Sequence, residues 1–487
     1  MNNEIILQRL KKYFHQPVYV AQSSEYLQYN DIKTYDFVIR GTEELAGRCE
    51  LNRWGRLIHF EIMMSVVLSD NELTEEELID IAREFVREFY PDICGEYELS
   101  AVFNMRELYS IYFEKKDDCL QVTIPYVGFN VGVAVDGQIV DFSFDYPKYK
   151  IEYLDEMITH EEAKKKFMNH IDLELAIEYC DKSTYINGDN NYHLLYKVNR
   201  SAPSIPATGE VRIVSNDDKF DYVPIEYQRT SFSSLYEALG ISKYYHKIGE
   251  QSFSSGKIEA YSKLLQVGNL EYSMFLPDDH VIKIAYDWQG KVKHILSGEF
   301  TSRLTNKLSV EEAREKALDF LFFIEPEADE KFYRRIHQMQ PVNDEELQEH
   351  FMNDEQSLRL YSQPSHEEMY RFLFQRVQSG IFVSDHFITI GIGKYTGQVR
   401  FLQNTIRSET ALSHMDLRPK VSKEEALAMY DKALRMELSL LPQFQGDLRV
   451  YQPGYLAKFD KEHHFVEAVD AHTGKLYEID LNDPIPY

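Results

Sequence analysis

The chain has 487 residues, and its 53 basic residues against 80 acidic ones give a formal net charge of −27. Hydrophobic residues make up 44% of the sequence and charged residues 27%, a composition that suits a folded protein with a large core and excludes a disordered acidic tail. The acidic excess argues against nucleic acid and anionic membrane surfaces as partners, because nucleic acids are bound through clusters of Lys and Arg. The length predicts two to four domains.

The first residues, MNNEIILQRLKKYFHQP, are polar where a secretory signal would need an apolar run. No later stretch approaches the ~20 apolar residues of a membrane-spanning helix, so we expect a cytoplasmic protein without membrane insertion. The cysteines are widely spaced and form no C-x-x-C pair. We therefore expect buried, reduced thiols, and neither a disulfide framework nor a zinc cage, at Cys49, Cys94, Cys119 and Cys180.

Four predicted helices begin with the same pattern, a hydroxyl residue followed three positions later by a glutamate. The pairs are Thr74 and Glu77, Thr159 and Glu162, Ser309 and Glu312, and Ser422 and Glu425. The pattern predicts capping boxes, in which hydroxyl and carboxylate each accept a backbone N–H at the helix start. The adjacent Glu-Glu pairs could instead be acid/base carboxylates or a site for a hard cation. Their recurrence at helix starts, where negative charge suits the helix dipole, favours the structural interpretation.

Six glycines are each followed, after one residue, by an aliphatic residue that starts an alternating run. This pattern predicts hairpin turns with positive φ at Gly55, Gly137, Gly209, Gly290, Gly397 and Gly474. Each turn lies in a unit consisting of one amphipathic helix and strands rich in Tyr, Phe, Val and Ile. The fold class that we predict is therefore α+β with antiparallel sheets.

The second half of the chain repeats the first in the same order. LTEEELIDIAREFV, from Leu73, matches LSVEEAREKALDFL, which starts 235 residues later at Leu308, and Pro91 and Pro326 follow at the same offset. We infer a tandem duplication with halves 1–228 and 229–487, each of about three helix-plus-meander units, joined by the polar segment 228–234. The largest departure between the halves is an acidic insertion at 327–369, which we regard as the best candidate for an interaction element.

The two tryptophans, Trp54 and Trp288, lie in similar contexts next to predicted turns. They could be exposed anchors for a partner, but packing within repeated units is the interpretation that we favour. The densest histidine group is His463, His464 and His472, and we expect surface histidines there because the spacing matches no recognised zinc pattern. His160 and His366 each precede a Glu-Glu pair without the second histidine of a zinc motif. Nucleophile-elbow, phosphate-loop and dinucleotide-binding motifs are absent.

The ordered series of capped helices and T-G-[KE]-[LV] hairpins resembles PepSY-like repeats. The doubled arrangement is similar to the YcdB/YcdC repeat family, with the resemblance extending over 73–145, 158–215, 308–402 and 421–480. The resemblance implies small α+β modules of the PepSY/cystatin-like kind. It implies no cofactor and no catalytic residues. Relatives with PepSY domains are associated with the inhibition or regulation of proteases, often at the cell envelope.

We therefore expect a non-enzymatic protein-interaction module, with the regulation or inhibition of a peptidase as its specific form. No catalytic, cofactor-binding or metal-binding residue is predicted. Two alternatives stay open: a hydrolase with a carboxylate-containing site in the cleft between the halves, and a structural assembly subunit.

Overall fold

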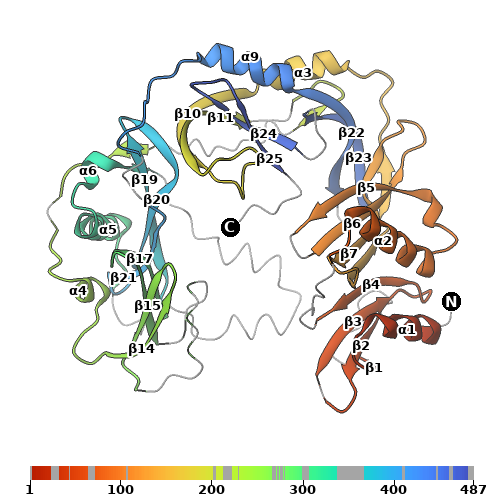
Figure 1. The fold of residues 1–487 in the computed structure, drawn as a ribbon, viewed down its shortest axis with the longest axis horizontal. Coiled ribbons are helices and arrows are strands. Elements are labelled where there is room, and N and C mark those ends of the chain that lie inside the picture. Colours follow the sequence, from red (N-terminus) through yellow and green to blue (C-terminus); the bar gives the residue numbers. More distant parts are fainter. Residues whose placement is uncertain are drawn as a thin grey trace.

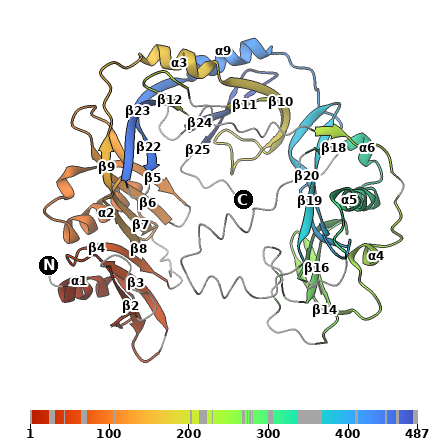
Figure 2. The same ribbon diagram turned by 180° about the vertical axis from the view of Figure 1, so that it is seen from behind.

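The computed structural model describes residues 3–23, 32–42, 44–63, 72–105, 108–200, 204–211, 222–228, 230–265, 270, 272, 274, 278, 280–298, 306–336, 367–407, 412–445, 448–459 and 464–480. These residues form an arch with two arms and a central part, and Figures 1 and 2 show the arch from opposite sides. The sheets are mostly antiparallel, so the predicted α+β class is confirmed.

The first arm is built around one eight-stranded sheet. Its helices are α1 (Asn3–Leu10), η1 (Lys11–Tyr13), α2 (Glu75–Phe89) and η2 (Cys94–Glu96), and its strands are β1 (Val18–Gln22), β2 (Lys33–Ile39), β3 (Leu45–Leu51), β4 (Leu57–Ile62), β5 (Tyr97–Asn104), β6 (Leu108–Lys116), β7 (Thr123–Ala134) and β8 (Ile139–Asp145). The strand order is β1-β2-β3-β4-β8-β7-β6-β5. Two four-stranded meanders therefore meet side by side at β4 and β8.

The second arm has the same connectivity. It contains α4 (Leu235–Leu239), α5 (Val310–Ile324), α6 (Ala328–Lys331) and the strands β14 (His246–Phe253), β15 (Gly256–Ser262), β16 (Val281–Asp287), β17 (Val292–Ser297), β18 (Phe332–Arg335), β19 (Met369–Gln378), β20 (Ile381–Gly393) and β21 (Val399–Asn404). Its strands follow the order β14-β15-β16-β17-β21-β20-β19-β18, and β13 (Tyr222–Pro224) adds to β18. A duplication would require this shared order, but the duplication itself stays a prediction.

The central part combines strands from both predicted halves. It contains α3 (His160–Met168), α9 (Lys423–Ala433), β9 (Lys148–Ile151), β10 (Ile171–Cys180), β11 (Asn191–Arg200), β12 (Ser204–Pro206), β22 (Arg435–Gln445), β23 (Leu448–Lys458), β24 (His464–Asp470) and β25 (Leu476–Asp480). The hairpin β10–β11 pairs with β24, whereas the hairpin β22–β23 pairs with β12. Each half thus completes the sheet of the other, so the sheets do not separate at the predicted boundary of 228 and 229. The division into halves remains a prediction about the sequence.

The helices lie along the outer side of the arch, and the sheets lie on its inner side (Figures 1 and 2). Three large cores account for this arrangement, because in each the apolar face of helices packs on one face of a sheet. Phe85 of α2, Phe320 of α5 and Phe167 of α3 represent the three cores. Two short parallel pairings tie strands of the two halves together, β9 with β23 and β10 with β20.

The local sequence predictions for helix starts and turns are confirmed. All four capping boxes form, with both reciprocal hydrogen bonds at each helix start. All six turn glycines have φ between 66° and 90°. Within the described ranges, no helix has the length and apolar character needed to cross a membrane.

Candidate functional site

A polar network covers one face of the central sheet β10-β11-β24-β25. Neighbouring residues of a strand point to opposite faces. Ile177 and Leu194 face the core beneath α3 and α9, so Glu178 and His193, which are paired across β10 and β11, face away from the helices. This face carries residues of both halves of the chain, because β24 follows β11 in the sheet.

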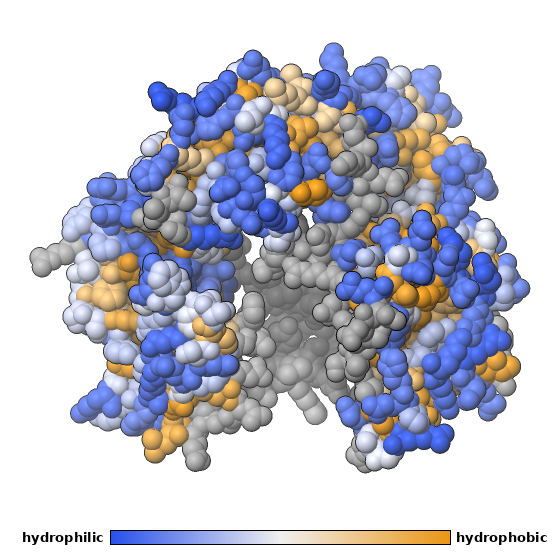
Figure 3. Space-filling view, viewed as in Figure 1, coloured by the Kyte–Doolittle hydropathy of each residue, from blue (hydrophilic) through white to orange (hydrophobic). Residues whose placement is uncertain are grey.

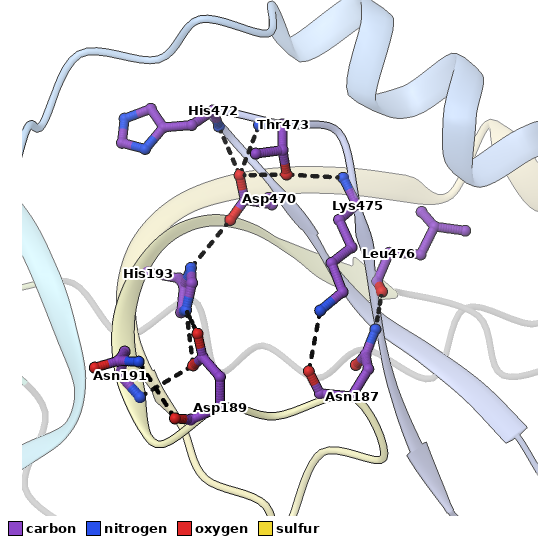
Figure 4. Close-up of polar contacts among 9 residues, drawn as sticks. All are labelled: Asn187, Asp189, Asn191, His193, Asp470, His472, Thr473, Lys475 and Leu476. Carbon is purple, nitrogen blue, oxygen red and sulfur yellow. Dashed lines mark hydrogen bonds and ion pairs between the residues drawn. The ribbon is translucent and has the colours of Figure 1, made fainter.

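His193 lies between two carboxylates, as Figure 4 shows. Its Nδ1 is 3.2 Å from Oδ2 of Asp470, and its Nε2 is 3.0 Å and 3.1 Å from the two oxygens of Asp189. The two aspartates differ in their burial. Asp470 is only 4% exposed, whereas Asp189 lies in an exposed turn.

The second carboxylate oxygen of Asp470 organises the turn that leads into β25. It accepts the N–H groups of His472 and Thr473 at 2.9 Å and 2.7 Å and the Thr473 hydroxyl at 2.9 Å (Figure 4). Gly474 closes this turn with φ 75°. The A-H-T-G sequence after Asp470 therefore fixes the carboxylate, and pairing of β11 with β24 brings His193 to it.

The surroundings stabilise the charged forms of this group. Hydrogen bonds to Asp470 and Asp189 raise the pKa of His193, although its partial burial opposes the rise. Burial raises the pKa of Asp470, but the hydrogen bonds from His193 and the turn outweigh it and hold that pKa below its usual range. The pKa of Asp189 is lowered in the same way, against partial desolvation. An imidazolium between two carboxylates is thus the favoured state.

A second polar group lies beside it on the same face. Glu178 accepts the Tyr185 hydroxyl at 2.9 Å, and its other oxygen is 2.7 Å from Nζ of Lys197. Burial lowers the pKa of Lys197, but the charge of Glu178 outweighs this and raises it overall. Asp385 of β20 also interacts with this pair, and burial together with the negative charge of Glu178 raises its pKa. Asp385 has φ 57°, a left-handed conformation that is uncommon for a non-glycine residue.

Cys180 and Tyr477 lie between the two polar groups. The Tyr477 ring centre is 5.3 Å from that of His193 and 5.5 Å from that of Tyr185. Burial, together with the negative charges of nearby carboxylates, raises the pKa of the Cys180 thiol to about 12. The thiol is therefore protonated at neutral pH, whereas nucleophilic and metal-binding cysteines are thiolates.

The network links strands of the two predicted halves, because His193 belongs to β11 and Asp470 to β24. Its buried charges are paired with each other, and the two carboxylates beside His193 favour the charged form of its ring. Among the residues that the structure describes, no three His, Cys, Asp or Glu side chains are arranged to hold a metal ion.

The structure contradicts the prediction that the two tryptophans pack within the repeated units. Trp54 is 65% exposed and Trp288 is 78% exposed. Trp54 lies in the turn between β3 and β4, and Trp288 lies in the turn of the equivalent hairpin between β16 and β17. Figure 3 shows one face of the molecule, on which hydrophobic residues are scattered among hydrophilic ones. Side chains of a tight turn are exposed unless they fold back onto the sheet. The glycine pattern predicted the turns but not the direction of the tryptophan rings.

The two turns have the same hydrogen bonds. The side chain of Asn52 accepts the N–H groups of Trp54 and Arg56, both at 3.0 Å. The side chain of Asp287 accepts those of Gln289 and Lys291, at 3.0 Å and 2.9 Å. With these turn residues superposed, Trp288 lies one position earlier than Trp54. Both rings are therefore presented by rigid turns, but from adjacent positions.

The histidines that the sequence singled out lie in different parts of the structure. His464 is partly buried and binds Glu478 at 2.8 Å through Nδ1, and the backbone of His472 belongs to the Asp470 turn. His160 is the first residue of α3, where its ring packs edge-on against Tyr455. His463 and His366 lie outside the described residues.

The cysteine prediction is correct in part. All four thiols are free, and Cys49 and Cys180 are buried. Cys119 is exposed and Cys94 is partly exposed, so burial was wrong for these two, which lie in short connections outside the sheet interior.

The insertion predicted at 327–369 begins and ends as regular structure. Its first residues form α6 and β18, and β18 has the same place in the second sheet as β5 in the first. Glu367, near its end, is buried and pairs with Arg400 at 2.8 Å. Residues 337–366 lie outside the described residues.

Sequence reasoning missed the network of His193 and Asp470. The two residues are 277 positions apart, and neither belongs to a recognisable motif. The one available signal was Asp470 before the H-T-G turn, because Asp commonly accepts backbone N–H groups of the next residues. That signal identifies a turn and does not predict the histidine.

Comparison with known proteins confirms the resemblance to the YcdB/YcdC repeat family. Residues 21–146 match the family model described as "YcdB, YcdC repeated domain". The chain is 24% identical over 439 residues to "Uncharacterized protein YcdB" of Bacillus subtilis (strain 168), an alignment that covers 84% of this chain and 83% of that protein. Among solved structures, the Bacillus megaterium YpeB C-terminal domain aligns with a TM-score of 0.27 and 12% identity, covering 44% of this chain and 89% of that domain.

Proposed function

We propose that this chain, whose residues 21–146 match the YcdB, YcdC repeated domain, is a non-enzymatic protein-interaction module. The observation that carries the proposal is the exposure of both tryptophans, at 65% for Trp54 and 78% for Trp288. Tryptophan is enriched in the binding hot spots of protein interfaces, because its ring buries a large area on contact. The exposed rings of two equivalent hairpins are therefore the anchors that we propose.

The turns favour this role because they hold the rings' backbone in place before a partner binds. The carbonyl oxygens of Asn52 and Asp287 accept the N–H groups of Gly55 and Gly290 at 2.8 Å and 3.0 Å, in addition to the side-chain bonds described above. A preorganised turn loses little conformational entropy on association. The guanidinium of Arg53 lies 4.1 Å from the Trp54 ring centre and adds a second side chain that is common at interfaces.

A peptidase is the class of partner that we propose, on the basis of the resemblance to PepSY-like repeats. The polar network of the central sheet does not favour the hydrolase alternative. The Cys180 thiol is protonated at neutral pH, both ring nitrogens of His193 are engaged by carboxylates, and the carboxylate of Asp470 is engaged by hydrogen-bond donors.

The proposal is tested by affinity purification of tagged protein from its source cells, with quantitative mass spectrometry. We expect the double variant W54A/W288A to lose specific proteins that the wild type retains. Y244A is the matched control, because Tyr244 is another exposed aromatic residue on a connection. If W54A/W288A and Y244A capture the same proteins in the same amounts as the wild type, the tryptophan anchors are refuted.

The peptidase class is tested on the proteins that depend on the tryptophans. We expect a peptidase among them, and we expect wild-type protein to change its rate of casein cleavage more than W54A/W288A does. A set of such proteins without any peptidase would contradict the choice of partner class and leave the interaction role standing.

A further inference from the structure

A groove of about 620 Å³ lies between α1 and β1, at the edge of the first arm. Apolar side chains form much of its wall, and Ile5 is 46% exposed there. The remaining lining consists of polar and charged groups. The lining residues are Glu4, Ile5, Leu7, Gln8, Arg9, Lys11 and Val20.

The strand beside this groove is the last strand of its sheet. Within the part of the chain that the structure describes, β1 pairs only with β2. The bond from Arg40 N to Pro17 O, at 3.0 Å, and the bond from Ser23 N to Thr34 O, at 3.1 Å, show which residues of β1 bond to β2. They are the odd-numbered ones, because bonded and non-bonded pairs alternate in an antiparallel ladder.

Val18, Val20 and Gln22 therefore direct their N–H and C=O groups outward, away from β2. Such a row of outward groups is a template for an added strand. The side chain of Val20 at the same time lines the groove, so an added strand would place a side chain opposite Val20 into it. Backbone bonds that give affinity and a pocket that gives specificity are the two parts of peptide recognition by strand addition.

The second arm provides a precedent within the same chain. There, the extended segment β13 adds in antiparallel orientation to the last strand of the sheet, with Val223 opposite Arg334. That segment comes from a distant part of the sequence. One edge of the second arm is thus already completed by a short extended segment, at the end of the sheet that corresponds to β5 of the first arm.

The charges of the groove indicate the chemistry of its occupant. Arg9 and Lys11 outnumber Glu4 in the lining, in a chain whose net charge is −27. Lys11 makes no ion pair within the described ranges. This locally positive rim complements a carboxylate.

We propose that β1 and this groove bind an extended segment of a partner protein, which adds as an antiparallel strand. Its alternate apolar side chains enter the groove beside Val20, and an acidic residue lies near Lys11. This inference rests on the proposed interaction function and names a recognition mode for it.

The probe for the test is the fluorescein-labelled peptide Glu-Val-Thr-Val-Thr-Val-Thr, and binding to the full chain is measured by fluorescence anisotropy. In an antiparallel pair, the residues that face Val20 both bond to β1 and point their side chains into the groove. N-methylation of the valines should therefore weaken binding by about tenfold or more, the effect of losing ~1.4 kcal/mol. N-methylation of the threonines should leave binding within about twofold, because their N–H groups point away from β1. Equal effects of the two methylation patterns, or no binding of the unmodified peptide, would overturn the proposal.

Variants of the chain provide the second arm of the test. I5E should weaken binding of the peptide by about tenfold, and K11E should weaken it several-fold by removing the positive charge. The matched control is I186E, because Ile186 is also an isoleucine that is 46% exposed. A loss with I186E as large as with I5E would contradict a site in the groove.

Light scattering distinguishes the other occupant, a second copy of the chain. A dimer that I5E dissociates would show that β1 pairs with another β1, and would overturn the proposal of a partner segment. If the peptide does not bind while the tryptophan-dependent capture described above persists, the groove proposal fails and the interaction function stands.

Discussion

Replacement of Asp470 by asparagine should weaken the join between β11 and β24 by about 3 kcal/mol. The asparagine side chain would keep one oxygen for the N–H groups of His472 and Thr473 but would lose the charge that faces His193. A hydrogen bond to a charged group contributes about 1.5–3 kcal/mol, and an amide N–H facing the imidazole adds a desolvation cost of about 1–3 kcal/mol. Because the His193 side chain is 23% exposed, water compensates part of both losses, and the expected total is about 3 kcal/mol.

Hydrogen exchange of the amides in β11 and β24 measures this effect locally, which matters because a chain of several parts need not unfold in two states. A loss of about 3 kcal/mol corresponds to amide exchange about 150-fold faster. The control is D189N, because the other carboxylate at His193 has 45% exposure and an exposed ion pair contributes less than about 1 kcal/mol. If D470N accelerates exchange no more than D189N does, the buried carboxylate does not hold the join, and the reasoning is wrong.

Three further predictions concern pH, thiols and glycines. Because the pKa of His193 is raised in the folded state, its contribution to stability is full below about pH 6.5 and is lost as the pH rises through the pKa of the folded state. The difference in urea midpoint between wild type and H193Q should therefore shrink as the pH rises over that range. Cys119 should react with Ellman's reagent in the folded protein, whereas the buried thiols of Cys49 and Cys180 should react only after unfolding. Reaction of Cys49 or Cys180 in the folded protein would contradict their placement in the core. G128A should lower the thermal midpoint more than G290A. A Cβ at residue 128 would lie 2.0 Å from the Phe113 carbonyl oxygen, whereas a Cβ at residue 290 would meet open space and add only the strain of φ 82°. Equal shifts of the thermal midpoint would refute this ranking.

The features that the sequence predicted correctly are local. Thr74 and Glu77 are three residues apart, and the hydrogen bonds of a capping box need nothing beyond that spacing. A glycine such as Gly137 adopts positive φ because of its own lack of a Cβ. Helix starts, hairpin turns and the α+β class follow from such short-range chemistry.

The exchange of strands in the central part could not be predicted in this way. The segment of β12 has the same alternation whether it pairs with β11 or with β23, and only the assembled structure decides between them. The same holds for the candidate network, since Glu178 and His193 belong to one hairpin but Asp470 reaches them through β24. Long-range pairing therefore limited the prediction of both the fold and the site.

The tryptophans illustrate a different limit. Repetition of Trp54 and Trp288 favoured packing, but a repeated turn is equally able to hold an exposed ring. Asn52 and Asp287, which fix the two turns, were visible in the sequence and predicted the turn without the direction of the ring. Exposure depends on what the rest of the chain places beside the turn.

Tryptophan fluorescence reports directly on the proposed anchors, because Trp54 and Trp288 are the only two tryptophans of the chain. We expect the fluorescence of the free protein to be that of solvent-exposed indole and to be readily quenched by acrylamide. Addition of a captured partner whose own tryptophans have been replaced by phenylalanine should shift the emission to shorter wavelength and reduce quenching. An unchanged spectrum and unchanged quenching at saturating partner would contradict the claim that these rings anchor the interface.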